Sequence, residues 1–219
     1  MSLDKVGHFV LGVVVKARMD RDGYLACIGG TDKLAVLPIA CADGPYRVHD
    51  RFYAAIKEPD PTAATGQNPN PLPILSQRSG FFLRHVCHAV FAQLIAEGRI
   101  IVDAVATVRH AGFVKIAVSS PTGEDPVKLC MPALKDFRLY SRLQPSLIQY
   151  SHMIEQFVRE SLKPAPVHAI ERLALSRAIK QVEVCVPSSV VGRFVGVHGM
   201  NVAVASRLTG HSIRVIGTP

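Results

Sequence analysis

The stretch that decides the fold is Gly196–Ile216, which reads GVHGMNVAVASRLTGHSIRVI. It opens on a Gly-x-x-Gly run between two segments with helical signals, Val190–Val195 and Met200–Leu208, and Ser212–Ile216 follows as a strand. Glycines let a backbone approach a sugar-phosphate chain without Cβ clashes, and the second helix would point its first N–H groups at the turn. The stretch therefore predicts a phosphate cradle, with a helix end that simply turns on glycines as the plainer alternative.

The order of elements around this stretch occurs twice, at a spacing of about 70 residues. The later copy adds a helix at His152–Leu162 and strands at Val167–Leu175 and Gln181–Val186. The earlier copy has, in the same order, a helix at Phe81–Ile95, strands at Ile100–Arg109 and Phe113–Ser119, helices at Asp125–Cys130 and Ala133–Leu143, and a strand at Leu147–Tyr150. Pro126 just inside a helix start fits this reading. The repeat predicts two small α+β domains in tandem.

The residues before Ser79 predict short strands separated by Gly, Pro and Asp. The expected strands are His8–Lys16, Tyr24–Ile28, Lys33–Ile39, Arg51–Lys57 and Ile74–Ser76. Five such strands fit a small barrel of the OB type. The proline-rich segment 58–73 cannot propagate a helix, so we expect an exposed loop there.

Charge favours a polyanionic partner for the later part of the chain. The 219 residues carry a formal net charge of +8. Residues 1–77 hold 8 basic and 8 acidic side chains, so the whole excess follows position 77. Nucleic acid is the first candidate and an anionic membrane the second, with a merely solvated basic face as the alternative.

Several classes of protein are excluded by what the sequence lacks. No apolar run approaches the roughly 20 residues of a spanning helix, and the N-terminus is not a secretory signal. The five cysteines form no C-x-x-C pair, which indicates reduced thiols and a cytoplasmic location. His85, Cys87 and His88 have no second ligand pair nearby, and no Walker or G-x-S-x-G motif occurs. We therefore expect neither a metal site, nor a cofactor, nor an enzyme.

The motifs together resemble one family. Gly196–Ile216 is similar to the second KH domain of the bacterial transcription factor NusA, where G-x-x-G-x-N-V leads into A-S-x-L-T-G. Ile74–Arg84, Val105–Ser119 and Asp125–Cys130 resemble the first KH domain of that family, and residues 7–58 resemble its S-one-type barrel. The resemblance implies a multidomain α+β fold: a small OB-type barrel over residues 1–73, a first KH domain over 74–150 and a second over 151–219, both of type II.

The resemblance also implies a function. It suggests a non-catalytic RNA-binding protein that modulates transcription elongation, termination or antitermination through single-stranded nascent RNA. RNA polymerase or other transcription factors would be further partners, and no membrane is involved. The alternative is a degenerate NusA-like structural component of a polymerase or ribonucleoprotein assembly, with weak RNA binding of its own.

The sequence departs from the family in two places. The N-terminal domain by which NusA proteins dock on polymerase has no counterpart in the seven residues before the barrel, so binding through it is not carried over. The first KH domain reads Met131-Pro132-Ala133-Leu134 where G-x-x-G is expected. Because proline lacks an N–H and its ring obstructs close approach, we expect the first KH fold to persist without its phosphate cradle.

Candidate RNA-binding residues follow from these assignments. Around the Gly-x-x-Gly run they are Arg193, Gly196, Val197, His198, Gly199, Met200, Asn201 and Arg207. On one face of the expected helix Ala133–Leu143 they are Lys135, Arg138 and Arg142, which would either contact RNA or form its solvated side. In the barrel they are Tyr24, Arg51 and Phe52. Strand alternation sends Phe52 and Tyr53 to opposite faces, so only one of the two can stack on a base.

Overall fold

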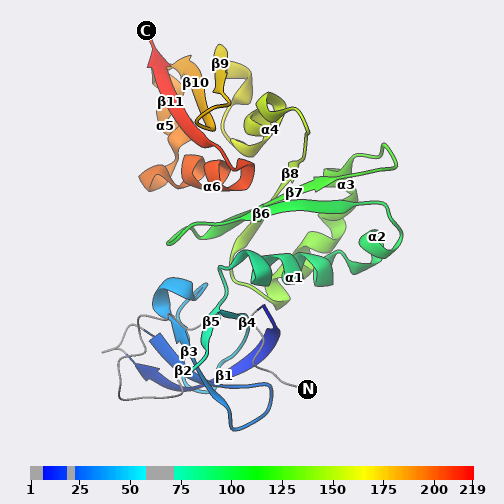
Figure 1. Cartoon of the computed structure of the whole chain (residues 1–219), viewed down its shortest axis with the longest axis vertical. Coiled ribbons are helices and arrows are strands. Elements are labelled where there is room, and N and C mark those ends of the chain that lie inside the picture. The colour runs from blue at the N-terminus through cyan, green and yellow to red at the C-terminus, as the bar shows by residue number, and fades with distance from the viewer. Residues whose placement is uncertain (1–6, 19–22, 58–71) are drawn as a thin grey trace. The chain divides into compact units, whose positions relative to one another are not determined.

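The N-terminal strands close into a five-stranded barrel, as the sequence predicts (Figure 1). The computed structural model describes residues 7–18, 23–57 and 72–219. The strands pair in the order β1-β2-β3-β5-β4. Their bounds are β1 Phe9–Arg18, β2 Gly23–Ile28, β3 Leu34–Pro38, β4 Arg51–Lys57 and β5 Ile74–Ser76. Most of the proline-rich segment 58–73, where an exposed loop was expected, lies outside the described residues.

Alternating side chains fill the barrel. Val10 and Val14 on β1 are buried, and so are Ala26 and Ile28 on β2, because every second residue of a strand points inward. A Cβ added at Gly12 would lie 2.5 Å from the ring of the inward-pointing Phe52, so a larger residue there would displace that ring. The inward-facing side chains of β1 and β2 therefore form part of the core of this barrel.

Two α-β-β-α-α-β arrangements follow the barrel (Figure 1). The first contains α1 Gly80–Val90, α2 Ala92–Ala96, β6 Ile101–Ala106, β7 Phe113–Ser119, α3 Pro126–Cys130, a 3₁₀ helix at Met131–Leu139 and β8 Gln144–Gln149. The second contains α4 Ile154–Ser161, β9 Arg172–Ser176, β10 Gln181–Pro187, α5 Val191–Val195, α6 Met200–Thr209 and β11 Ser212–Thr218. In each sheet the central strand, β7 or β10, is antiparallel to the strand before it and parallel to the last strand. The repeated order confirms the expected α+β fold class, a barrel followed by KH-type topology.

The described residues fall into two compact units. One comprises the residues up to Val86 together with Asp136–Leu143, and the other comprises Cys87–Lys135 together with Gln144–Pro219. The second unit holds both three-stranded sheets. There, Phe157 of α4 and Val204 and Leu208 of α6 form one buried cluster with small residues of the β6-β7-β8 sheet, including Ala117. Small side chains on this sheet face let the helices approach closely.

Three of the expected elements differ from the structure in their bounds or type. The helix expected over Phe81–Ile95 breaks at Phe91, whose backbone leaves helical geometry at φ −104° and ψ 19°. The strand expected over Val167–Leu175 starts only at Arg172, because Val167–Ala169 form a 3₁₀ turn after Pro166. The helix expected over Ala133–Leu143 is wrong in type and extent: a 3₁₀ helix runs from Met131 to Leu139 and stops before Arg142.

Candidate nucleic-acid interface

The Gly-x-x-Gly run forms a tight left-handed turn between α5 and α6. Gly196 has φ +74° and ψ 173°, His198 has φ +50°, and Gly199 has φ +74°. The Gly199 N–H donates to the Gly196 carbonyl over 3.1 Å, which closes the turn. Three of these four residues have a positive φ, which turns the chain back on itself, so that only this turn separates α5 from α6.

The two glycines are needed for different reasons. A Cβ on Gly196 would lie 2.7 Å from the Cβ of Asn201, closer than real Cβ contacts, so this glycine allows the loop to pack on α6. A Cβ on Gly199 would meet no heavy atom within 4 Å, so this glycine opens onto free space. Both also have a positive φ, which residues with a Cβ rarely adopt. Gly199 is therefore where a bulky group from outside can approach the backbone.

The turn offers unpaired donors to such a group. Among the described residues, the peptide N–H groups of Val197 and His198 have no acceptor in the protein. Val197 is 74% exposed, and His198 is also exposed. Arg193, one turn before Gly196 on α5, carries an exposed guanidinium. Free amides beside a permanent cation form a site that favours an anion such as phosphate.

Asn201 has a different place from the one the sequence suggests. Its side chain is buried and makes three internal hydrogen bonds. Nδ2 donates to the carbonyl oxygens of Leu162 (3.0 Å) and Phe194 (2.9 Å), and Oδ1 accepts from Nζ of Lys115 at 2.6 Å. Both polar atoms of this side chain are thus bonded within the protein, so the side chain is not free to contact RNA. Asn201 fixes the turn against α4 and α5 instead.

Lys115 is a buried neighbour of Asn201 that the sequence did not indicate. It lies on the central strand β7, only 1% exposed, and its Nζ also donates to the carbonyl oxygens of Ser161 and of Lys163 (2.9 Å) at the C-terminal end of α4. Burial lowers the pKa of this ammonium from its ordinary value to about 8. Three oxygen acceptors and the negative end of the α4 dipole favour the charged form. An alternating strand pattern gives no sign that a lysine points inward.

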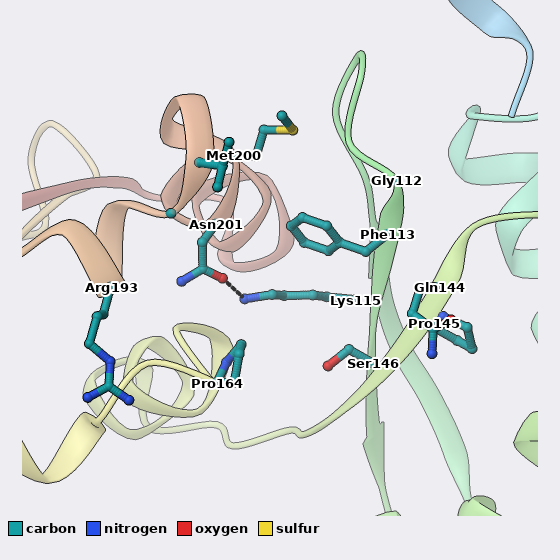
Figure 2. A pocket seen from close by; sticks show the side chains of 12 residues that line it. Gly112, Phe113, Lys115, Gln144, Pro145, Ser146, Pro164, Arg193, Met200 and Asn201 are labelled. Atoms are coloured by element: carbon teal, nitrogen blue, oxygen red, sulfur yellow. Dashed lines mark hydrogen bonds between the residues drawn. The ribbon is translucent and has the colours of Figure 1, made fainter. Parts of the chain in front are cut away.

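A cavity of about 630 Å3 adjoins the turn (Figure 2). Its wall combines the turn and α6 with β7, the start of β8 and the segment that follows α4. The residues that line it are Gly112, Phe113, Lys115, Gln144, Pro145, Ser146, Pro164, Arg193, Gly196, Val197, Met200 and Asn201. Five of the expected site residues are thus brought together here, whereas the residues from β7 and β8 were not expected.

The remaining expected residue of α6 lies apart from the turn. Arg207 is near the C-terminal end of the helix, and its guanidinium donates to the Thr107 carbonyl over 3.2 Å. It links α6 to the loop after β6, and its side chain is otherwise exposed.

The first copy of the fold forms no comparable turn. The Asp125 carboxylate caps α3 by accepting from the N–H groups of Val127 and Lys128, and α3 then passes into the 3₁₀ helix at Met131 with helical backbone angles. No positive φ occurs at Met131 or over the 3₁₀ helix. The backbone therefore stays helical at the position where a phosphate cradle would need a turn with positive φ.

Lys135, Arg138 and Arg142 do not share one helical face. Lys135 and Arg138 lie exposed on the 3₁₀ helix, and Arg142 lies beyond its end. The Arg142 guanidinium stands 4.4 Å over the ring of Tyr46 and donates to the Pro45 carbonyl, within the barrel unit. The expected basic stripe is wrong because the last turn of the expected helix does not form.

Asp43 holds the segment around Arg142 to the barrel. Its carboxylate accepts from the Ser141 hydroxyl (2.8 Å), the Arg142 N–H (2.7 Å) and the Tyr46 hydroxyl (2.6 Å). Burial, followed by the neighbouring Asp43 charge, raises the pKa of Tyr46. Arg142 thus has a structural task that the sequence does not indicate.

The aromatic candidates of the barrel lie mostly inside it. Phe52 is 4% exposed and belongs to the core, so its expected role in stacking on a base is wrong. Tyr24 is half-buried, and its hydroxyl accepts from the Tyr46 N–H at 3.2 Å. Arg51 is exposed at the start of β4, and Tyr53 is the half-buried partner that alternation sends outward. Arg51 alone of the three expected barrel residues is freely exposed.

Two further observations on the described residues concern their helices and the side chains that can bind a metal ion. No helix among them is long and apolar enough to cross a membrane. Within the same residues, no group of three or more His, Cys, Asp or Glu side chains could hold a metal ion.

Comparison with known proteins gives one informative match. No curated protein matches the chain. A solved structure titled "Crystal structure of APE1850" is similar over 62% of this chain and 96% of that chain, with 19% identity and a TM-score of 0.43. The family described as "NusA-like second KH domain" matches residues 154–218, which include α4, the three strands β9, β10 and β11, and the Gly-x-x-Gly run Gly196–Gly199, called the GVHG turn below. KH domains are non-catalytic modules that bind nucleic acid. Residues 154–218 are thus similar to the second KH domain of NusA-like proteins.

Proposed function

We propose that this protein binds single-stranded RNA without catalysis and acts as a NusA-like modulator of transcription elongation, termination or antitermination. The GVHG turn carries the proposal: Gly199 opens onto free space, and two peptide N–H groups of the turn have no protein acceptor among the described residues. A phosphate of the RNA would accept from the N–H groups of Val197 and His198. Arg193 would add a permanent positive charge beside it.

The proposal assigns residues 1–73 to a barrel domain, 74–150 to a first KH domain and 151–219 to a second. The second supplies the phosphate cradle. In the first, Lys135 and Arg138 are exposed cations that contribute charge rather than a backbone cradle. Polymerase or other transcription factors are the expected protein partners, in the cytoplasm.

The test compares two glycine substitutions of equal charge. Gly199→Asp puts a carboxylate where the phosphate would lie, so RNA affinity should fall by about tenfold or more. Gly98→Asp is the matched control: Gly98 also has a positive φ (+67°) and open space around its missing Cβ, but it lies in the turn after α2. Filter binding with single-stranded RNA of random sequence measures both. Equal affinities for the wild type and Gly199→Asp would reject the cradle.

A second function is favoured by a separate observation. The helical backbone at Met131–Leu139 offers no cradle in the first KH domain, and residues 1–77 have no net charge. A NusA-like structural component of a polymerase or ribonucleoprotein assembly would show weak binding to free RNA and tight co-purification with polymerase or ribosomes. A pull-down with the full chain, before and after RNase treatment, separates the two functions, because only the structural component keeps its partners without RNA.

A further inference from the structure

The cavity beside the GVHG turn has features that an anion site does not require. Its walls are largely apolar: Phe113 on β7, Pro145 on β8, Pro164 after α4, and Met200 on α6. Figure 2 shows the Phe113 ring projecting from β7 into the same space as Met200. A phosphate gains nothing from such walls, whereas a flat aromatic ligand gains from both dispersion and exclusion of water.

The polar groups of the cavity are of two kinds. Lys115 and Asn201 are already bonded to each other and to backbone carbonyls, so they shape the wall. The side chains of Gln144, Ser146 and Arg193 make no hydrogen bond within the part of the chain that the structure describes. They leave an amide, a hydroxyl and a guanidinium available at an apolar opening. This combination of apolar walls and a few unpaired polar groups is typical of small-ligand sites.

The size of the cavity and its position relative to the turn restrict the ligand. About 630 Å3 lies within the range of about 300–1,000 Å3 for sites that hold small molecules. Gly196 and Val197 belong both to the cavity wall and to the phosphate-binding turn. A single nucleotide could therefore place its phosphate at the turn and its base in the cavity.

We propose that the cavity receives one nucleobase of the RNA strand, from a nucleotide whose phosphate lies at the GVHG turn. The inference rests on the proposed function. The base would stack on the Phe113 ring and turn its polar edge toward Gln144 and Ser146. An amide and a hydroxyl both donate and accept, so this pair can satisfy the edges of more than one base. The strand would leave past Arg193.

The experiment compares ordinary and base-free chains. Fluorescence anisotropy is measured with labelled 12-nucleotide oligo-U, oligo-A and oligo-C, and with an abasic ribose-phosphate chain of the same length. Phe113→Leu keeps an apolar wall but removes the aromatic face, and should weaken binding of at least one ordinary RNA about tenfold while leaving the abasic chain unaffected. Phe81→Leu, at an exposed ring in α1 outside the cavity, should change neither.

A second variant protects the test against misfolding of the first. Replacing both Gln144 and Ser146 by Ala removes the unpaired polar groups from partly or fully exposed positions, and should reduce the differences in affinity among the three homopolymers. Photo-crosslinking of 4-thiouridine RNA should label peptides that contain Phe113 or Ser146.

The failures are distinguishable. If the wild type binds none of the RNAs, the proposed function fails and this inference fails with it. If the wild type binds RNA, Gly199→Asp abolishes binding, and both cavity variants bind like the wild type, the cradle stands and the base site is overturned. Equal losses on ordinary and abasic chains would also overturn it, because the change would then act on the backbone contact.

Discussion

Replacing Lys115 by Met should change how the stability of the protein depends on pH. In the folded chain, burial lowers the pKa of the Lys115 ammonium to about 8, whereas the unfolded chain keeps the ordinary value near 10.5. Between these two values the unfolded state binds more protons than the folded state. The free energy of unfolding of the wild type therefore rises with pH from about 8 to about 10.5, and this gain is absent at lower pH.

The magnitude follows from the shift. One pKa unit corresponds to about 1.36 kcal/mol. A pH of 9 lies about one unit above the pKa of Lys115 in the folded chain, where the side chain is mostly neutral, whereas in the unfolded chain it is still charged. From pH 7 to pH 9, the wild type should thus gain about 1.3 kcal/mol relative to Lys115→Met. The variant has no titrating group at this position, so every other ionisation cancels in the difference.

The assay is urea unfolding of both proteins at pH 7, 8 and 9, followed by circular dichroism. Carbon-13 NMR of the lysine Cε atoms gives the midpoint of Lys115 directly. A difference in unfolding free energy that stays flat or falls as the pH rises, together with a midpoint above 10, would refute the reasoning. It would show that the three oxygens around Nζ outweigh the cost of burial.

Three further changes test the packing of the turn, the barrel and α3. Gly196→Ala should lower the free energy of unfolding by about 2 kcal/mol, because of its positive φ and the nearby Cβ of Asn201, whereas Gly192→Ala, with open space and helical backbone, should not; urea titration compares them. Asp43→Ala removes the acceptor of three hydrogen bonds and should speed tryptic cleavage after Arg142. An unchanged cleavage rate would argue against Asp43 as the residue that holds this segment to the barrel. Asp125→Ala removes the cap of α3 and should cost about 1 kcal/mol, a value that thermal unfolding would contradict if the midpoint did not move.

The expected cradle and the expected basic stripe differ in how far sequence could locate them. The cradle depends on backbone angles within four residues, and the glycines at 196 and 199 indicate in the sequence where a positive φ can occur. The stripe depended on a helix continuing to Leu143. Local spacing favours that helix, but contacts of Arg142 and Ser141 with Asp43, about a hundred positions away, hold the chain in another path.

The barrel shows the same division. Alternation predicted that Phe52 and Tyr53 point to opposite faces, which the structure confirms. Period-two spacing does not say which face is the core, because both residues are aromatic. The ring of Phe52 lies inside because Gly12 on the paired strand leaves room for it, a relation between β1 and β4.

By itself the sequence determined the order of elements, the class of fold and the position of the glycine turn, because these follow from periodicity, turn residues and backbone freedom over short distances. Only the tertiary structure decided that Asn201 supports the turn from inside, that Lys115 is the buried partner of Asn201, and that strands β7 and β8 complete a cavity with the turn. These depend on which distant segments meet, and a side chain's polar atoms are committed or free only once its neighbours are in place.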